Sequence, residues 1–147
     1  VLQALRDSVM PQINERGHTY EERIDGPLPE LWADYYRLLQ VLVNLVSNAY
    51  KYTPNGGRIT LEAQRDGPRV RFAVSDTGVG MDAESLSKLG TKFWRAADEF
   101  TRSQPGSGLG FAITRSLIEQ MGSHIEIEST PGAGSRFAFS VAVYSGA

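Results

Sequence analysis

Residues 34–57 read DYYRLLQVLVNLVSNAYKYTPNGG and carry the clearest helical pattern of the chain. Apolar residues recur there at spacings of three and four, which predicts an amphipathic helix over 34–50 with one face buried against a sheet. The helix is expected to stop at TPNGG, because proline and glycine disfavour its continuation. The predicted buried face comprises Leu38, Val41, Leu42, Leu45 and Ala49.

A second, polar stripe runs along the same helix and consists of Arg37, Gln40, Asn44, Asn48 and Lys51. Asparagine is a mediocre helix former, so two asparagines followed by a lysine along one stripe of a helix are unusual. One interpretation is an ordinary solvated face. The other is that the carboxamide oxygens bind a hard cation such as Mg²⁺ while the lysine meets phosphate. The stripe alone leaves both open.

Further helices and strands are predicted on both sides of this helix. Residues 2–16 form an amphipathic helix that Pro11 should kink or shorten, and 19–24 a weak strand. RITLEAQR (58–65) and VRFAVSD (70–76) alternate with period two around the turn RDGP, and HIEIEST (124–130) and RFAFSVAV (136–143) do so around PGAG. A short helix at 83–88, a long loop at 90–107 and a helix at 109–121 lie between them. The last helix should present Leu109, Ile113, Leu117 and Met121 on one face.

Helices on one face of a largely antiparallel sheet give an α+β two-layer sandwich. The length of 147 residues predicts one domain, 1–147. A net charge of −2 gives no reason to expect nucleic acid or an anionic membrane as partner, and the lack of cysteine excludes disulfides and thiolate chemistry. No apolar run approaches the ~20 residues that span a bilayer, and no signal peptide is recognisable. The opening VLQALRDSV suggests a piece of a longer protein.

Asp76 ends a predicted strand and has the parity of Val70, Phe72 and Val74, which places its carboxylate on the inward face. A buried carboxylate destabilises the fold unless it is hydrogen-bonded or paired. It can belong to an Asp-Thr-Gly turn, in which it accepts from nearby backbone amides. Alternatively it is the acceptor at the base of a pocket, waiting for an exocyclic amine. Gly78 and Gly80 would then let the backbone pass close to a flat ring.

A glycine-rich segment, SQPGSGLGFAITRSLIEQMG (103–122), leads into the helix at 109–121. Its glycines suit a phosphate cradle, a hinge or a plain loop, because amides at a helix start and the helix dipole favour anions. The segment is not a Walker A motif, and it does not have the spacing of a dinucleotide fingerprint.

Taken together, the ordered motifs resemble the catalytic and ATP-binding domain of sensor histidine kinases, in the GHKL superfamily with its Bergerat fold. NLVSNAYKYTPNGG resembles the N-box of that family, DTGVGM its first glycine box, KFWRA its F-box and GSGLGFAI its second glycine box. The resemblance covers residues 2–143. It implies a mixed, mostly antiparallel sheet of about five strands, three helices on one face, and a mobile ATP lid at 90–107.

The resemblance also implies residue roles. Asn48 would ligate Mg²⁺ with support from Asn44, Lys51 would contact phosphate, and Asp76 would accept from the adenine amino group. Asn44, Lys51 and Arg95 would be the catalytic residues. The nucleotide would also be lined by Tyr52, Gly78, Gly80, Met81, Phe93, Gly106, Ser107, Gly108, Leu109, Gly110 and Ser135.

The implied function is transfer of the γ-phosphoryl group of Mg-ATP to a histidine. Members that hydrolyse ATP carry a glutamate at the position of Asn44, and an asparagine cannot act as a general base. Both histidines of the chain, His18 and His124, are expected to be exposed and chemically idle. The acceptor would therefore lie on a dimerisation and phosphoacceptor domain of the same parent protein. The family further implies a response regulator as an indirect partner, no nucleic acid, no membrane contact by this domain, and a cytoplasmic location.

A second hypothesis is a nucleotide-dependent interaction module. Such a module would belong to a degenerate kinase or resemble the anti-sigma factors that phosphorylate a serine. The F-box and the long lid favour the histidine kinase branch, and none of the box residues needed for ATP is missing.

Overall fold

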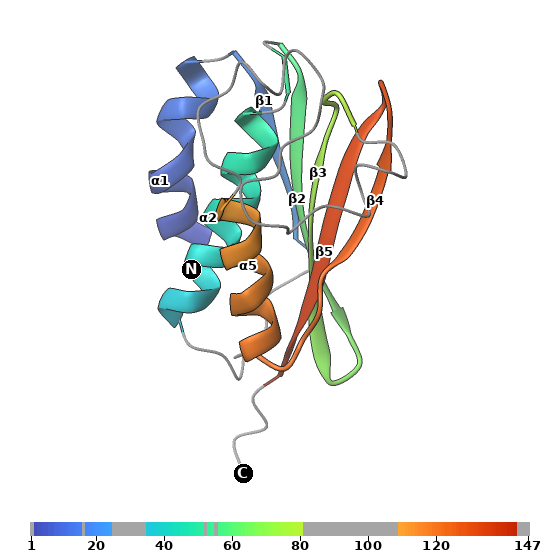
Figure 1. Cartoon of the computed structure of the whole chain (residues 1–147). Coiled ribbons are helices and arrows are strands. Elements are labelled where there is room, and N and C mark those ends of the chain that lie inside the picture. Colours follow the sequence, from blue (N-terminus) through green and yellow to red (C-terminus); the bar gives the residue numbers. More distant parts are fainter. Residues whose placement is uncertain are drawn as a thin grey trace.

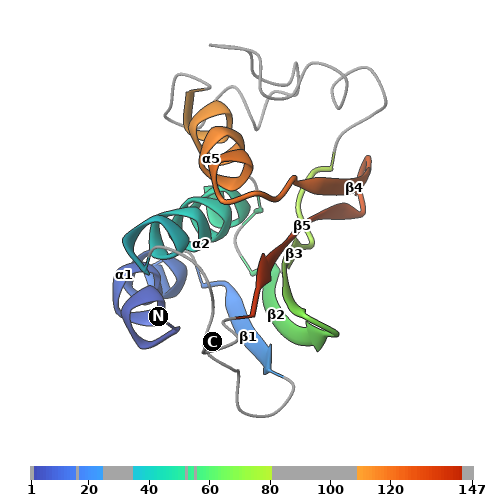
Figure 2. The same ribbon diagram turned by 90° about the horizontal axis from the view of Figure 1, so that it is seen from below.

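The computed structural model describes residues 2–15, 17–24, 35–51, 53–54, 56–80 and 109–143, and for 109–112 the backbone alone. Three helices in this part of the chain cover one face of a five-stranded sheet, which Figure 1 shows from the side and Figure 2 from below. The elements are α1 (Leu2–Glu15), β1 (Thr19–Ile24), α2 (Tyr35–Lys51), β2 (Arg58–Asp66), β3 (Arg69–Asp76), α5 (Leu109–Gln120), β4 (Glu126–Thr130) and β5 (Gly134–Ala142). The expected α+β sandwich is confirmed. The helix predicted at 83–88 and the loop at 90–107 lie outside the described residues.

The sheet is mixed, with strand order β1-β2-β3-β5-β4. β1 is parallel to β2, and the other three pairs are antiparallel. A parallel pair needs a crossover connection, and α2 lies in the connection between β1 and β2. The two antiparallel hairpins, β2–β3 and β4–β5, are the ones that the alternating sequence patterns predict.

The core lies between the helices and the inner face of the sheet. Period-two alternation buries Ile59, Leu61 and Ala63 on β2 and the corresponding residues of β3 and β5. The rings of Phe72 and Phe139 stack there with centroids 5.5 Å apart. The predicted face of α2 is buried as expected, together with Val46 and with residues of α1, namely Leu5, Val9 and Ile13.

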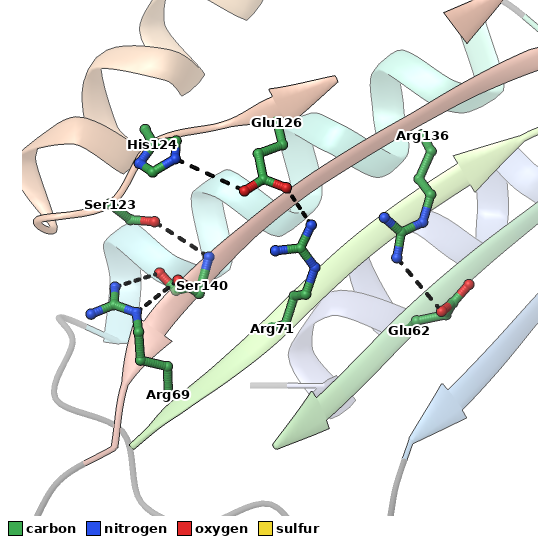
Figure 3. Close-up of polar contacts among 8 residues, drawn as sticks. All are labelled: Glu62, Arg69, Arg71, Ser123, His124, Glu126, Arg136 and Ser140. Carbon is green, nitrogen blue, oxygen red and sulfur yellow. Dashed lines mark hydrogen bonds and ion pairs between the residues drawn. The ribbon is translucent and has the colours of Figure 1, made fainter. Parts of the chain in front are cut away.

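The outer face of the sheet carries ion pairs between strands that are separated by one intervening strand (Figure 3). Arg71 pairs with Glu126, and Nη2 of Arg136 lies 3.9 Å from Oε2 of Glu62. Exposed pairs of this kind add little stability each. They mark this face as solvated, so the site has to be sought on the inner face. Figure 3 also shows the polar contacts of Arg69, Ser123, His124 and Ser140.

Two details of the helices differ from the sequence expectation. Pro11 lies inside α1 without ending it, since the helix continues to Glu15 with anchoring residues buried on both sides of the proline. Among the described side chains of α5, Thr114 and Ile118 are buried, while Ile113 is 47% exposed. Leu117 and Met121 of the predicted stripe do pack against the core. A repeat of four residues drifts by about 40° per step around a helix of 3.6 residues per turn, which leaves Ile113 outside the buried side.

None of the helices among the described residues is long and apolar enough to cross a membrane.

Candidate functional site

The polar stripe of α2 divides into an exposed half and a half-buried half. Arg37 and Gln40 are exposed, whereas Asn44, Asn48 and Lys51 are half-buried. Asn44 and Asn48 follow the buried Val41 by three and seven positions, so they lie on the side of the helix that borders the core. Two carboxamides and an ammonium group therefore line one flank of α2 at its C-terminal end.

A row of polar side chains crosses the inner face of the sheet at one end. Asp76 on β3 is the register partner of Ser135 on β5, which in turn pairs with Ser129 on β4. Residues directly opposite in an antiparallel ladder point to the same face, so all three side chains share the face that the helices cover. The inward position predicted for Asp76 is confirmed, and so is the place of Ser135 beside it.

Asp76 combines both interpretations that its sequence context allows. Its Oδ1 accepts a hydrogen bond of 2.8 Å from the backbone amide of Gly78, as in an Asp-Thr-Gly turn. Burial nevertheless raises the pKa of Asp76 to about 6, although hydrogen bonds from the backbone amides of Gly78 and Ser135 oppose the shift. A carboxylate offers about four acceptor positions, so these bonds leave capacity for a further donor. The carboxylate of Asp76 is therefore a strong hydrogen-bond acceptor, and these two hydrogen bonds offset only part of its desolvation.

The wall next to Asp76 is built from two backbone segments in direct contact. The amide of Gly132 in the β4–β5 turn donates to the carbonyl of Val79 at 2.7 Å. A Cβ on Gly80 would lie 2.0 Å from the carbonyl oxygen of Thr130, and one on Gly134 would lie 2.0 Å from that of Asp76. Both glycines have positive φ, of 70° and 108°. Gly80 is therefore required by contact with the chain itself, whatever it contributes to a flat ligand.

The remaining predicted site residues fall into two groups. Gly110 lies in the first turn of α5, and Leu109 begins that helix, but its side chain is not described. Outside the described residues are Tyr52, Met81, Phe93, Arg95, Gly106, Ser107 and Gly108.

The two histidines lie in different environments, and the expectation for one of them is wrong. The side chain of His124 is 82% exposed, as expected from its parity with Glu126. His18 is buried, with 7% of its surface exposed, and its Nε2 lies 2.8 Å from the carbonyl oxygen of Thr53. The prediction of exposure followed from polar neighbours in the sequence. It could not include a backbone acceptor that lies 35 residues further along the chain.

Two polar residues next to the site were not singled out from the sequence. Oγ of Ser129 lies 2.7 Å from Oγ of Ser135, so the hydroxyls of β4 and β5 are joined. The hydroxyl of Thr77 accepts a 2.9 Å bond from the amide of Arg58. Ser129 shares its parity with the inward-facing Ile127, so the alternation in HIEIEST contained the signal for it. Thr77 had no such signal, because its partner is a backbone group on another strand.

The chemistry of these donors restricts the kind of metal that the site could hold. No group of three or more His, Cys, Asp or Glu residues suited to a metal ion occurs in the part of the chain that is described. Mg²⁺ needs few protein ligands when phosphate oxygens and water supply the rest. The half-buried Asn48 fits such a site, whereas a zinc site would need imidazole or thiolate ligands.

Comparison with known proteins shows the family of the chain. Residues 33–145 match the family described as histidine kinase-, DNA gyrase B- and HSP90-like ATPase. The Caulobacter vibrioides non-motile and phage-resistance protein is 42% identical over 82% of the chain, and the chain covers 15% of that protein. The adaptive-response sensory kinase SasA of Synechococcus elongatus is 37% identical over 98% of the chain, which covers 38% of its length. The chain thus spans well under half of either relative.

Solved structures support the same assignment. Full-length ShkA in complex with AMPPNP superposes with a TM-score of 0.81 at 32% identity, over 97% of this chain and 30% of that one. The mycobacterial sensor histidine kinase MprB gives a TM-score of 0.82 over 97% of this chain and 95% of that one. At 22% identity it shows likeness of fold alone. The chain belongs to the histidine kinase-, DNA gyrase B- and HSP90-like ATPase family and is a histidine kinase catalytic domain of the type found in two-component sensor kinases.

Proposed function

We propose that this domain binds Mg-ATP and transfers its γ-phosphoryl group to a histidine on a separate dimerisation and phosphotransfer domain of the same parent protein. A response regulator would then receive the group from that histidine. A partner of this kind is seen with one protein of similar fold, because the histidine kinase ThkA has been solved in complex with the response regulator TrrA. The observation that carries the proposal is the half-buried carboxylate of Asp76, whose desolvation is only partly offset by hydrogen bonds, on the same side of the sheet as α2.

The adenine end of the proposed site centres on Asp76. An ionised carboxylate that is shielded from water gains more from an amine donor than a solvated one does. The exocyclic amino group of adenine is a donor of this kind, and Ser135 on the neighbouring strand offers a hydroxyl next to it. The direction of the pKa shift supports a ligand donor, because an incoming donor would favour the charged form that burial disfavours.

The phosphate end would lie along the half-buried flank of α2. Mg²⁺ bound along this flank would neutralise part of the phosphate charge. Asn48 would hold the ion through its carboxamide oxygen, Asn44 would support it one turn earlier, and Lys51 would meet the phosphates. Arg95, which lies outside the described residues, is proposed to complete the set from the lid.

Transfer to a protein acceptor is favoured over hydrolysis by the composition of α2. The helix contains no aspartate or glutamate, so it offers no carboxylate base to activate water. Neither histidine of the chain is a proposed acceptor. His18 is buried and hydrogen-bonded, and His124 lies on the solvated face of the sheet near Glu126.

Calorimetric titration with Mg-ATP tests the binding step. Asn48→Ala should abolish the dependence of affinity on Mg²⁺. Gln40→Ala, on the exposed half of the same stripe, is the matched control and should change nothing. Persistence of the metal effect in Asn48→Ala would rule out that ligand.

Titration with adenosine tests the adenine role of Asp76 without interference from phosphates. Asp76→Asn should weaken binding, and in the wild-type protein the affinity should fall as the pH drops through about 6, because the acceptor becomes protonated. Affinity that is unchanged by the substitution would exclude this role.

Phosphorylation of a supplied dimerisation and phosphotransfer domain tests the transfer step. The label should be acid-labile and alkali-stable, as expected for a phosphohistidine. An acid-stable label would indicate a serine kinase instead, and nucleotide binding without any labelling would indicate an interaction module.

A further inference from the structure

His18 is a buried donor at the junction between α1 and β1. Its Nε2 lies 2.8 Å from the carbonyl oxygen of Thr53 and 3.1 Å from that of Pro54. Carbonyl oxygens only accept, so Nε2 carries the proton and donates to both. The backbone amide of His18 itself donates to the carbonyl of Ile13 at 3.1 Å, which anchors the residue to the last turn of α1.

His18 contacts the connector between α2 and β2, residues 52–57. Further contacts hold this connector against the α1–β1 junction. The amide of Thr19 donates to the carbonyl of Gly57 at 2.9 Å, and the amide of Gly57 to that of Pro54 at 3.1 Å. A Cβ on Gly57 would lie 2.2 Å from Cγ2 of Thr53, which is itself fully buried. The connector is therefore bonded at both ends to the α1–β1 junction.

This connector lies between the two ends of the proposed nucleotide site. It follows α2, which ends at Lys51. It leads into Arg58, whose amide and carbonyl bond the hydroxyl and amide of Thr77 at 2.9 and 3.1 Å. Thr77 follows Asp76, and the β2–β3 ladder also fixes that end independently through the pairing of Ile59 with Asp76. At the end of the connector near α2, the imidazole of His18 holds the carbonyls of Thr53 and Pro54.

We propose that His18 is a positioning residue for the phosphate end of the site. By holding the carbonyls of Thr53 and Pro54, the imidazole sets where α2 ends and hence where Lys51 lies relative to the phosphates. It does not touch the nucleotide. The inference rests on the proposed binding of Mg-ATP. It adds a residue, outside the boxes that carry the family resemblance, on which phosphate binding depends.

Three variants separate this role from general stabilisation. His18→Leu removes the donor, and His18→Gln keeps an amide N–H able to reach the same carbonyls. His124→Leu alters the exposed histidine as a matched control. Each folded variant is titrated with Mg-ATP and, separately, with adenosine, which lacks the phosphates.

The loss of this shared hydrogen bond should weaken Mg-ATP binding by about fivefold in His18→Leu while adenosine affinity stays within about twofold. His18→Gln should restore most of the Mg-ATP affinity, and His124→Leu should leave both affinities unchanged. Equal losses for both ligands, or no loss at all, would overturn the positioning role. A wild-type protein that binds no Mg-ATP would instead refute the proposed function, and the inference with it.

A measurement on the wild-type protein covers the case in which His18→Leu does not fold. Nitrogen-15 spectra of the labelled imidazoles should show His18 in the Nε2–H tautomer, with a resonance that moves on addition of Mg-ATP and not of adenosine. A ring protonated on Nδ1 alone, or a resonance that ignores Mg-ATP, contradicts the proposal.

Discussion

Asp76 holds a carboxylate where the surrounding protein disfavours its charge. Burial raises its pKa from 3.8 to about 6, and the two backbone hydrogen bonds only partly offset this. A group whose pKa is raised by folding stabilises the fold fully at a pH below the unfolded value, and that contribution disappears as the pH rises through the folded value. At neutral pH the ionised Asp76 is therefore a source of instability in the ligand-free protein.

Asp76→Asn should accordingly stabilise the ligand-free protein at pH 7 by roughly 2–3 kcal/mol, since each pKa unit corresponds to about 1.4 kcal/mol. The gain should vanish below pH 3.8, grow as the pH rises from 3.8 to about 6, and stay constant above that. Urea unfolding of both proteins across this range measures it. A difference that does not vary with pH would show that the carboxylate is not the cause. If the same variant also binds adenosine more weakly, the ionised carboxylate of Asp76 lowers the stability of the fold while it serves binding.

Gly80 is restricted both by its backbone conformation and by its neighbour. Gly80→Ala combines a positive φ of 70° with a Cβ 2.0 Å from the Thr130 carbonyl, and we expect a loss of about 3 kcal/mol or more. Gly67→Ala is the control, because Gly67 has a φ of 61° but open space around its Cβ position. It should lose about 1 kcal/mol. Equal losses in denaturant unfolding would show that the close approach does not matter.

At the scale of the elements, α5 shows what a helical pattern does and does not determine. The sequence predicted the helix to within a residue and placed Leu117 and Met121 on the core side, but among the described side chains the buried ones are Thr114 and Ile118, and Ile113 is exposed. Ile118→Ala should cost about 2–5 kcal/mol, whereas Ile113→Ala should change stability by about 0.5 kcal/mol or less. Thermal unfolding of the two variants compares them directly. A larger loss at Ile113 would restore the original prediction.

The strands were predictable because alternation is a local property. The patterns 58–65 and 70–76 placed Ile59, Phe72 and Asp76 on the inner face, and the structure agrees. Pairing between distant segments was not predictable in the same way. The parallel register of Thr19 with Arg58 and the bond from His18 to Thr53 join residues about 35 to 40 positions apart, and periodicity contains no information about such partners.

At the scale of the whole molecule, the site depends on bringing the C-terminal end of α2 and the end of β3 to the same side of one sheet. Sequence patterns supplied the candidate residues, whereas their joint role came from the resemblance of ordered motifs. The family match over residues 33–145 confirms that resemblance, and the roles of individual residues stay predictions.

Binding should stabilise the entire domain, since a ligand that binds only the folded state shifts the unfolding equilibrium. At a concentration of Mg-ATP about 100 times Kd the gain is ~2.7 kcal/mol, which corresponds to a rise in Tm on the order of 5–10 °C for a chain of this length. A thermal scan with and without Mg-ATP measures the shift. Asp76→Asn should show a smaller shift, and an identical one would contradict the adenine role.

The backbone contact between the β4–β5 turn and the chain after β3 has a practical consequence for attaching reporters. Exposed hairpin turns ordinarily accept inserted peptides. Both turns of this sheet are exposed, but Gly132 is bonded to Val79 and Gly134 packs on Asp76. A peptide tag placed between Asp66 and Gly67 should leave ATP affinity intact, whereas the same tag after Gly132 should abolish it. A fluorescent fusion of this domain therefore belongs in the β2–β3 turn.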